Sequence, residues 1–233
     1  MLLAYQGFER GVATFYDLPG ISWSDPLQVC SRVQVTLISP EGFEAGGTPG
    51  ADIGAVSAWD TEIGNRSVIV GIIDTGIDYT HPDLRDNLWT NDAELHGQPG
   101  VDDDGDGIVD DIYGAQFTGG DGQPTNGDPF DDLFHGTHVA GIIGATGNNG
   151  IGIAGVNHAV RLMAVKAFNS QGEGATADAL AALEYAVSKG AHLTSNSWGG
   201  PDYDQALSAG SRQPALPVNC SSPPPATRRP MMT

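Results

Sequence analysis

The stretch Val68–Gly76, with the sequence VIVGIIDTG, is the part of the chain that decides the fold. Its run of mostly branched apolar residues is typical of a strand buried on both faces, as central strands of parallel sheets are. The strand ends in the carboxylate of Asp74, and functional groups in open parallel sheets gather at the carboxyl ends of the strands. Asp74 is therefore a candidate functional residue, although an aspartate here also suits the capping of a turn.

A second informative stretch, Phe134–Gly141, has the sequence FHGTHVAG. From His138 to Ala145 the residues are apolar on every side, which predicts a helix buried in the core. His135 lies at the start of this helix, and an imidazole on a rigid element is a candidate general base because it titrates near neutral pH. A lone histidine is more often only a hydrogen-bonded residue at a helix start. With Asp74, however, it completes two thirds of a nucleophilic relay.

The rest of the chain alternates strands with helices. Strands are predicted at residues 160–168 and 192–198, and a helix over residues 175–189, with Thr176 as its N-cap and Gly190 as its end. Strand, helix, strand, helix, strand in this order implies right-handed crossovers and a mainly parallel sheet. The fold class is therefore α/β, with three layers and helices on both faces of the sheet.

These motifs resemble the subtilisin-like serine proteases, the subtilases of peptidase family S8. The likeness rests on residues 72–78 (IIDTGID), 81–84 (HPDL) and 135–141 (HGTHVAG), which occur in the family's order. The resemblance implies a serine endopeptidase in which Asp74 orients His135 and His135 is the general base, while His138 is a structural helix residue. It also implies a short helix near residues 58–60 that packs on the core.

The resemblance further implies a binding edge for an extended peptide or protein substrate. In the family, two segments pair their backbones with the substrate, so that main-chain bonds accept any sequence and pockets select side chains. From the residues alone, a strand that ends in a glycine turn explains the second segment equally well. The residues that match these two segments are Gly172, Glu173, Gly174, Ser197, Trp198 and Gly199.

The loop between residues 101 and 132 is strongly acidic. Asp102, Asp104 and Asp106 alternate before a glycine and are followed by Asp110, a spacing that suits oxygen ligands of calcium. The pattern is not a complete EF-hand loop, because Tyr113 stands where that loop requires a glutamate. Calcium is therefore a candidate cofactor, and a merely solvated acidic loop is the alternative.

The composition of the chain argues against some classes of binding partner. The 233 residues carry 29 Asp and Glu against 10 Lys and Arg, a net charge of -19, which argues against nucleic acid or an anionic membrane surface as a partner. No apolar run approaches the ~20 residues of a membrane span. Residues 1–10 do not have the pattern of a signal peptide, although the resemblance implies an extracellular protein. Residues 150–155 match a dinucleotide fingerprint only formally, since they follow a helix, so no organic cofactor is expected.

The carboxyl-terminal residues depart from the family pattern. The chain divides into an unassigned segment (1–47), a partial peptidase domain (48–207) and a Pro-rich tail (208–233) without helical or strand periodicity. Neither the family's Gly-Thr-Ser-x-Ala-x-Pro motif nor its oxyanion asparagine is present. We expect a fold that is incomplete at its carboxyl terminus and truncated before the nucleophile, with a tail read out of frame, and hence an inactive chain. A genuine short variant and a pseudogene product are the alternatives.

Parts of the sequence also resemble what three other functions would require. A non-catalytic peptide- or calcium-binding module would keep the substrate edge and the acidic loop. An aspartic protease would need a second Asp-Thr-Gly triplet or a symmetric dimer, whereas the chain has one triplet, at Asp74. A zinc site at His135 and His138 lacks a further pair of ligands. Cys30 and Cys220 support no disulfide or metal site.

Overall fold

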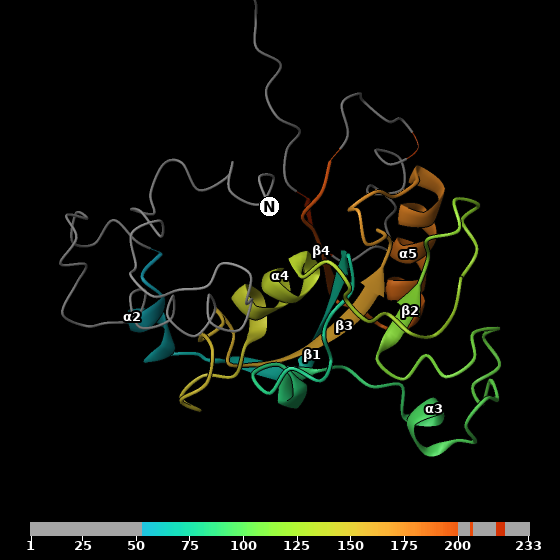
Figure 1. Ribbon diagram of the computed structural model, residues 1–233. Helices are drawn as coiled ribbons and strands as arrows, with labels where there is room; N and C mark the ends of the chain where they lie inside the picture. Colours follow the sequence, from blue (N-terminus) through green and yellow to red (C-terminus); the bar gives the residue numbers. More distant parts are fainter. Residues whose placement is uncertain (1–52, 200–205, 207–217, 222–233) are drawn as a thin grey trace, which may run out of the picture.

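Five parallel strands form a sheet around the predicted central strand (Figure 1). Their order is β2-β3-β1-β4-β5, so β1 lies in the middle. At its carboxyl end β1 pairs with β3 in a register that places Asp74 opposite Lys166. The strands are β1 (Gly64–Asp74), β2 (Gly114–Gln116), β3 (Ala159–Lys166), β4 (Leu193–Asn196) and β5 (Val218–Ser221).

This computed structural model describes residues 53–199, 206 and 218–221. The unassigned segment 1–47 and most of the tail after residue 207 lie outside the described residues, so the predicted domain boundaries stay predictions. Within the described part of the chain, no helix is both long and apolar enough to cross a bilayer.

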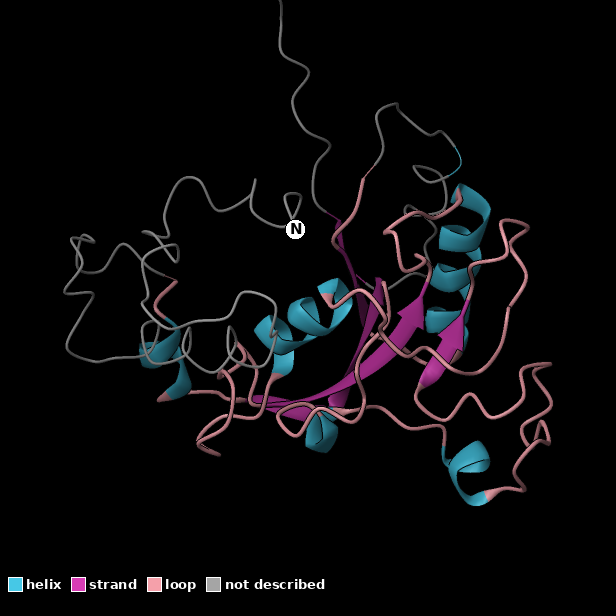
Figure 2. Cartoon of the chain, in the orientation of Figure 1, coloured by secondary structure: helices cyan, strands magenta, loops and turns pink. Residues whose placement is uncertain are grey.

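The two long helices cover opposite faces of the sheet (Figure 2). Alternate residues of β1 point to opposite sides, so that Ile73 packs in one apolar cluster with Leu183 of α5 and Ile72 packs in the other with Ala140 of α4. The predicted three-layer α/β architecture is confirmed. The helices are α2 (Ala55–Trp59), the 3₁₀ turn η2 (Arg85–Asn87), α3 (Asp92–His96), α4 (His135–Gly144) and α5 (Thr176–Ser188).

The apolar run of β1 forms a strand because both of its faces are covered. Ile72 and Ile73 are fully buried. Gly71 faces α5, where an added Cβ would lie 3.2 Å from the Cβ of Ala186 and 3.3 Å from Cγ2 of Thr194. A glycine at this position therefore lets α5 and β4 approach the central strand closely.

Helix α4 differs from the prediction in its burial. It begins at His135, as predicted, and its first turn includes the polar part of the motif. It is not apolar-buried on every side, since Ile142 is 40% exposed and His138 is also exposed. One face of α4 packs on the sheet through Ala140 and Gly144, and the other is not covered by described residues.

Three boundaries were mispredicted. The N-cap of α5 is Ala175, and Thr176 is its first helical residue, so the predicted Thr176 cap is wrong. Strand β4 ends at Asn196, before the turn that carries Trp198. Strand β5 lies in the tail where we expected no strand, and it pairs with β4 in parallel. The end of α5 agrees with the prediction, as Gly190 has a positive φ of 83°.

Packing on the sheet predicts the cost of core truncation. Leu162 of β3 is completely buried, so Leu162→Ala should lower the free energy of unfolding by about 2–5 kcal/mol. The matched change Ile142→Ala removes a side chain that is 40% exposed and should cost less than about 1 kcal/mol. Urea unfolding followed by circular dichroism measures both, and equal losses would contradict the burial of β3.

Candidate active site

Asp74 and His135, which are 61 residues apart in sequence, form a direct hydrogen bond. Nδ1 of His135 lies 2.6 Å from Oδ1 of Asp74. Because a carboxylate only accepts, Nδ1 carries the proton in this bond. The same Oδ1 accepts the backbone N–H of Thr75 at 2.8 Å, while the buried Oδ2 accepts no hydrogen bond from described residues. The Asp74 side chain is 3% exposed and that of His135 is 28% exposed. An incoming group can therefore reach the imidazole but not the carboxylate.

A glycine at the start of α4 lets this helix come close enough to the end of β1 for Asp74 and His135 to bond. Phe134 precedes α4 in the left-handed region, with φ of 79°, and turns the chain into the helix. A Cβ at Gly136 would overlap the carbonyl oxygen of Gly76 and lie 3.1 Å from Cβ of Asp74. Only glycine at position 136 lets the first turn of α4 approach the end of β1 this closely.

Asp131, which the sequence analysis did not single out, lies in the loop before α4 and is 7% exposed. Its carboxylate contacts both elements that carry the Asp74–His135 pair, through the hydroxyls of Thr75 and Thr137. The available signal was an acidic residue just before a helix start, which is common at N-termini and therefore weak.

The electrostatic surroundings of His135 favour its charged form. The hydrogen bond to Asp74 raises the pKa of His135 above its usual value of 6.5, burial of the ring opposes this, and the negative charges of Asp74 and Asp131 add to the increase. An imidazole whose protonated form is stabilised in this way is suited to accept a proton during a reaction.

Both predicted substrate segments, residues 172–174 and 197–199, lie close to the side chain of Phe168. The ring of Trp198 packs against that of Phe168, with 5.3 Å between centroids, and its Nε1 donates to the carbonyl of Ile73 at 2.8 Å. A Cβ at Gly174 would lie 2.7 Å from Cδ1 of the same Phe168. The structure thus brings these two segments to the carboxyl edge of the sheet, where Asp74 also lies.

The other residues of these two segments are partly or fully exposed. Gly172 has a positive φ of 75°, and the backbone of Glu173 exchanges hydrogen bonds with Asn169. Ser197 is half-buried, with its hydroxyl 3.5 Å from that of Ser195. Gly172, Glu173 and Gly199 are exposed.

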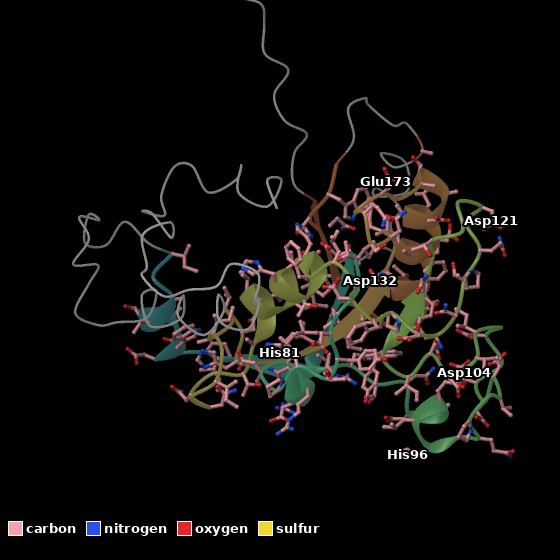
Figure 3. The ribbon with its side chains drawn as sticks, in the orientation of Figure 1. His81, His96, Asp104, Asp121, Asp132 and Glu173 are labelled. Carbon is pink, nitrogen blue, oxygen red and sulfur yellow. The ribbon has the colours of Figure 1, made fainter. Side chains whose placement is uncertain are left out.

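The acidic loop forms a separate cluster: Asp104 lies near α3, apart from Asp132, which precedes α4 (Figure 3). Asp102, Asp104 and Asp106 each offer an oxygen within 4.8 Å of the others. The structure does not bring Asp110 into this group, because both of its oxygens accept the N–H of Gly100.

Two more acids and one lysine complete this cluster. Asp111 directly follows the predicted acids in sequence, whereas Glu94 and Lys189 were not predicted to belong to the cluster. Glu94 and Asp111 lie within the same 4.8 Å of an Asp104 oxygen. Nζ of Lys189, from the end of α5, pairs with Asp104, with Asp106 at 2.9 Å and with Asp111 at 3.0 Å. Lys189 lies 85 residues from Asp104 in sequence, so only the fold could reveal that it belongs to the cluster.

Burial and hydrogen bonding oppose each other at Lys189. Desolvation disfavours its ammonium, but the bonds to the three carboxylates outweigh this and raise its pKa. At Asp111, burial raises the pKa despite the hydrogen bonds from Tyr185 and Lys189 that lower it. Lys189 is therefore an internal counter-ion of the acidic loop.

We expect the contribution of His135 to stability to fall as pH rises. Its pKa is higher in the folded chain than the ordinary 6.5, so the added stability is complete below about pH 6.5 and is lost as pH passes the higher folded value. Urea unfolding of the wild type and His135→Gln between about pH 5.5 and about pH 9 measures this. The difference between them should shrink with rising pH. A difference that grows toward alkaline pH would contradict the arrangement.

Comparison with known proteins agrees with this geometry. Relatives include "Subtilisin-like protease 1" of Plasmodium vivax, 47% identical over 138 residues, which are 59% of this chain and 21% of that protein. "Thermophilic serine proteinase" of Bacillus sp. (strain AK1) is 38% identical over 142 residues, 61% of this chain and 28% of its own. "Minor extracellular protease Vpr" of Bacillus subtilis (strain 168) is 36% identical over 169 residues, 68% of this chain and 18% of its own.

The chain thus spans between 18% and 28% of the length of these relatives. A sequence model of the subtilase family matches residues 65–221, which include α4 and every strand of the sheet except the first residue of β1. That match covers well over half of the 233 residues. The chain therefore belongs to the subtilase family.

Proposed function

We propose that this chain supplies the acid and the base of a serine endopeptidase, with Asp74 and His135 in those roles. The observation that carries the proposal is the 2.6 Å bond between them. It keeps the proton on Nδ1, so that Nε2 carries a lone pair. Nε2 then takes the proton of a serine hydroxyl as its oxygen attacks a peptide carbonyl, and Asp74 stabilises the imidazolium that forms. His135 returns the proton to the leaving amine.

The serine is the missing partner of this pair. The 233 residues contain no Gly-Thr-Ser-x-Ala-x-Pro motif, so we propose that the nucleophile and the oxyanion asparagine come from residues other than those of this sequence. The partial domain of residues 48–207 is then one portion of a catalytic unit. Without a nucleophile, Asp74 and His135 have no hydroxyl to activate, and we expect the 233-residue polypeptide alone to leave peptide bonds intact.

The substrate of this unit is an extended peptide. Residues 172–174 and 197–199 lie near Phe168 at the carboxyl edge of the sheet, and Gly172, Glu173 and Gly199 are exposed. The N–H and the carbonyl of Glu173 already bond Asn169, so a peptide that pairs with Glu173 has to displace these bonds. Backbone pairing on both sides of a peptide accounts for binding without sequence selection. One relative is named an extracellular protease, which supports the expectation that this chain also acts outside the cell.

Removal of either member of the pair tests the proposal. In a protein that continues this chain with the family's serine motif, His135→Ala should lower kcat by about a millionfold and Asp74→Ala by about ten-thousandfold, as in subtilisin. Hydrolysis of a chromogenic peptide measures this, and exposed His96→Ala is the control. Retention of activity by His135→Ala would sink the proposal.

The 233-residue chain gives the complementary test. A fluorophosphonate probe reacts only with an activated serine, so it should label the longer protein and leave this chain unlabelled. Labelling of this chain would show that one of its own serines is the nucleophile.

We further propose that the acidic loop binds calcium through Asp102, Asp104 and Asp106. Their oxygens lie close enough together to share one hard cation, and several further ligands of such ions are usually carbonyls and waters. Lys189 already neutralises part of this cluster, so a cation has to compete with its ammonium. When bound, calcium would crosslink the loop, with no part in the acid–base chemistry of His135.

Calcium should therefore raise the melting temperature of the folded chain. Calcium at a concentration 100-fold above its Kd should raise the free energy of unfolding by about 2.7 kcal/mol. Asp106→Asn should weaken this response, Lys189→Met should strengthen it by removing the competing charge, and exposed Asp92→Asn should leave it unchanged. Thermal unfolding with calcium and with EDTA measures the effect; an unchanged melting temperature in the wild type and in Lys189→Met would refute the site.

A further inference from the structure

Asp131 makes more hydrogen bonds than any group in the Asp74–His135 pair, and none of them is to His135. It accepts five, all from its own loop, from α4 and from the residue after Asp74. The donors are the N–H groups of Leu133 (3.0 Å), Phe134 (2.9 Å) and Thr137 (2.9 Å) and the hydroxyls of Thr137 (2.6 Å) and Thr75 (2.9 Å). A buried carboxylate that accepts this many hydrogen bonds is held in one orientation.

Thr75 is the link from Asp131 to the end of β1. Its hydroxyl donates to Asp131 and accepts the N–H of Gly136 at 2.9 Å, while its own N–H donates to Asp74 at 2.8 Å. Its carbonyl accepts from Nζ of Lys166 at 2.7 Å. Every polar group of Thr75 is therefore bonded, and its hydroxyl joins the strand that carries Asp74 to the helix that carries His135.

Thr137 is the link from Asp131 to α4. It is the third residue of the helix, and its N–H and hydroxyl both donate to Oδ2 of Asp131. The hydroxyl oxygen also accepts the N–H of Asp78, which follows β1. The N-cap residue Phe134 has no side chain acceptor, so Asp131 satisfies an N–H that the helix start leaves open.

We propose that Asp131 is a positioning residue, which sets the distance between Asp74 and His135 through the hydroxyls of Thr75 and Thr137. This inference rests on the proposed function, because the distance matters for catalysis only if the two residues act as acid and base. Asp131 itself touches neither the reacting atoms nor the exposed edge of the imidazole. It acts by holding the end of β1 and the start of α4 in one register.

The charges around His135 come from several elements. Asp74 faces it from β1, Asp131 from the preceding loop, and His138 from the next turn of α4. Lys166, at the end of β3, is 3% exposed and pairs with Asp132 at 2.6 Å. Removing the charge of Asp131 would therefore alter His135 even without any positioning effect, so the test needs variants that keep every charge.

Two charge-neutral substitutions isolate the positioning effect. Thr75→Val and Thr137→Val each remove a hydroxyl that bonds Asp131 and leave all ionisable groups in place. Thr75→Ser keeps the hydroxyl and serves as the rescue. Asp128→Asn is the charge control, because Asp128 is an exposed acid of the same loop whose Oδ1 bonds Tyr79 and the N–H of Phe130, both of which an asparagine can retain.

The readout is the pKa of His135 and the resonance of its Nδ1 proton, followed by NMR of the imidazole in the 233-residue chain. His135→Gln assigns the signals. We expect Thr75→Val and Thr137→Val to lower this pKa by about 0.5 or more and to move the Nδ1 proton upfield, because the bond to Asp74 lengthens. Asp131→Asn should do the same, with a larger fall in pKa. Thr75→Ser and Asp128→Asn should resemble the wild type.

Wild-type values in both folded valine variants would overturn the proposal, since the hydroxyls would then not set the pair. If one valine variant loses its backbone amide dispersion, and hence its fold, the other carries the test. If Thr75→Ser loses its dispersion as well, the role of Thr75 is purely structural and the proposal is overturned too. Because NMR needs no nucleophile, these results are independent of peptidase activity. A longer protein without activity, but with the expected pKa changes, would reject the proposed function and keep the positioning role.

Discussion

The burial of the Asp74 carboxylate at the end of β1 is the constraint on which the rest of this structure depends. A buried charge needs partners, and here one oxygen accepts from Thr75 and His135 while the other accepts from no described residue. The bond to His135 therefore offsets much of the cost of burying the acid. Asp74 requires α4 to start at this point of the sheet, and Gly136 lets it come close enough.

The acidic composition follows the same rule elsewhere in the fold. Asp111 is fully buried, and it is held by Tyr185, Asn91 and Lys189 rather than by solvent. Lys166 is nearly as buried, and it bonds the carbonyl of Thr75, which follows β1, and the exposed carboxylate of Asp132. Lys189 thus neutralises a buried acid, whereas Lys166 is itself a buried charge that an acid neutralises.

Helix α4 connects the packing to the chemistry. Ala140 and Gly144 pack on the sheet, while Ile142 on another face is exposed. At its amino end, its open N–H groups and those of the preceding loop converge on Asp131, which fixes the helix start against β1. The same turn carries the imidazole of His135, so the contacts that stabilise the helix start also affect the geometry of the Asp74–His135 pair.

The strand that ends at Asp74, the helix after His135 and the alternation of strands with helices could be predicted from sequence, because local periodicity reports burial. The long motifs also predicted Asp74 and His135 as the acid and the base. Less local features could not be predicted. The N-cap of α5, the exposure of Ile142 and the strand β5 depend on what packs beside them, and sequence periodicity carries no record of neighbours.

By itself, then, the sequence determined the fold class, the family and the identity of the pair Asp74 and His135, since each depends on short patterns of hydrophobicity or motif. The tertiary structure alone decided which other polar groups surround them. Asp131 reaches Thr75 across 56 residues, and Lys189 reaches Asp104 across 85. Such contacts arise because the fold brings the end of β1 to the start of α4 and the end of α5 to the acidic loop. Hydrogen bonds act only over about 3 Å in space, whatever the separation along the chain.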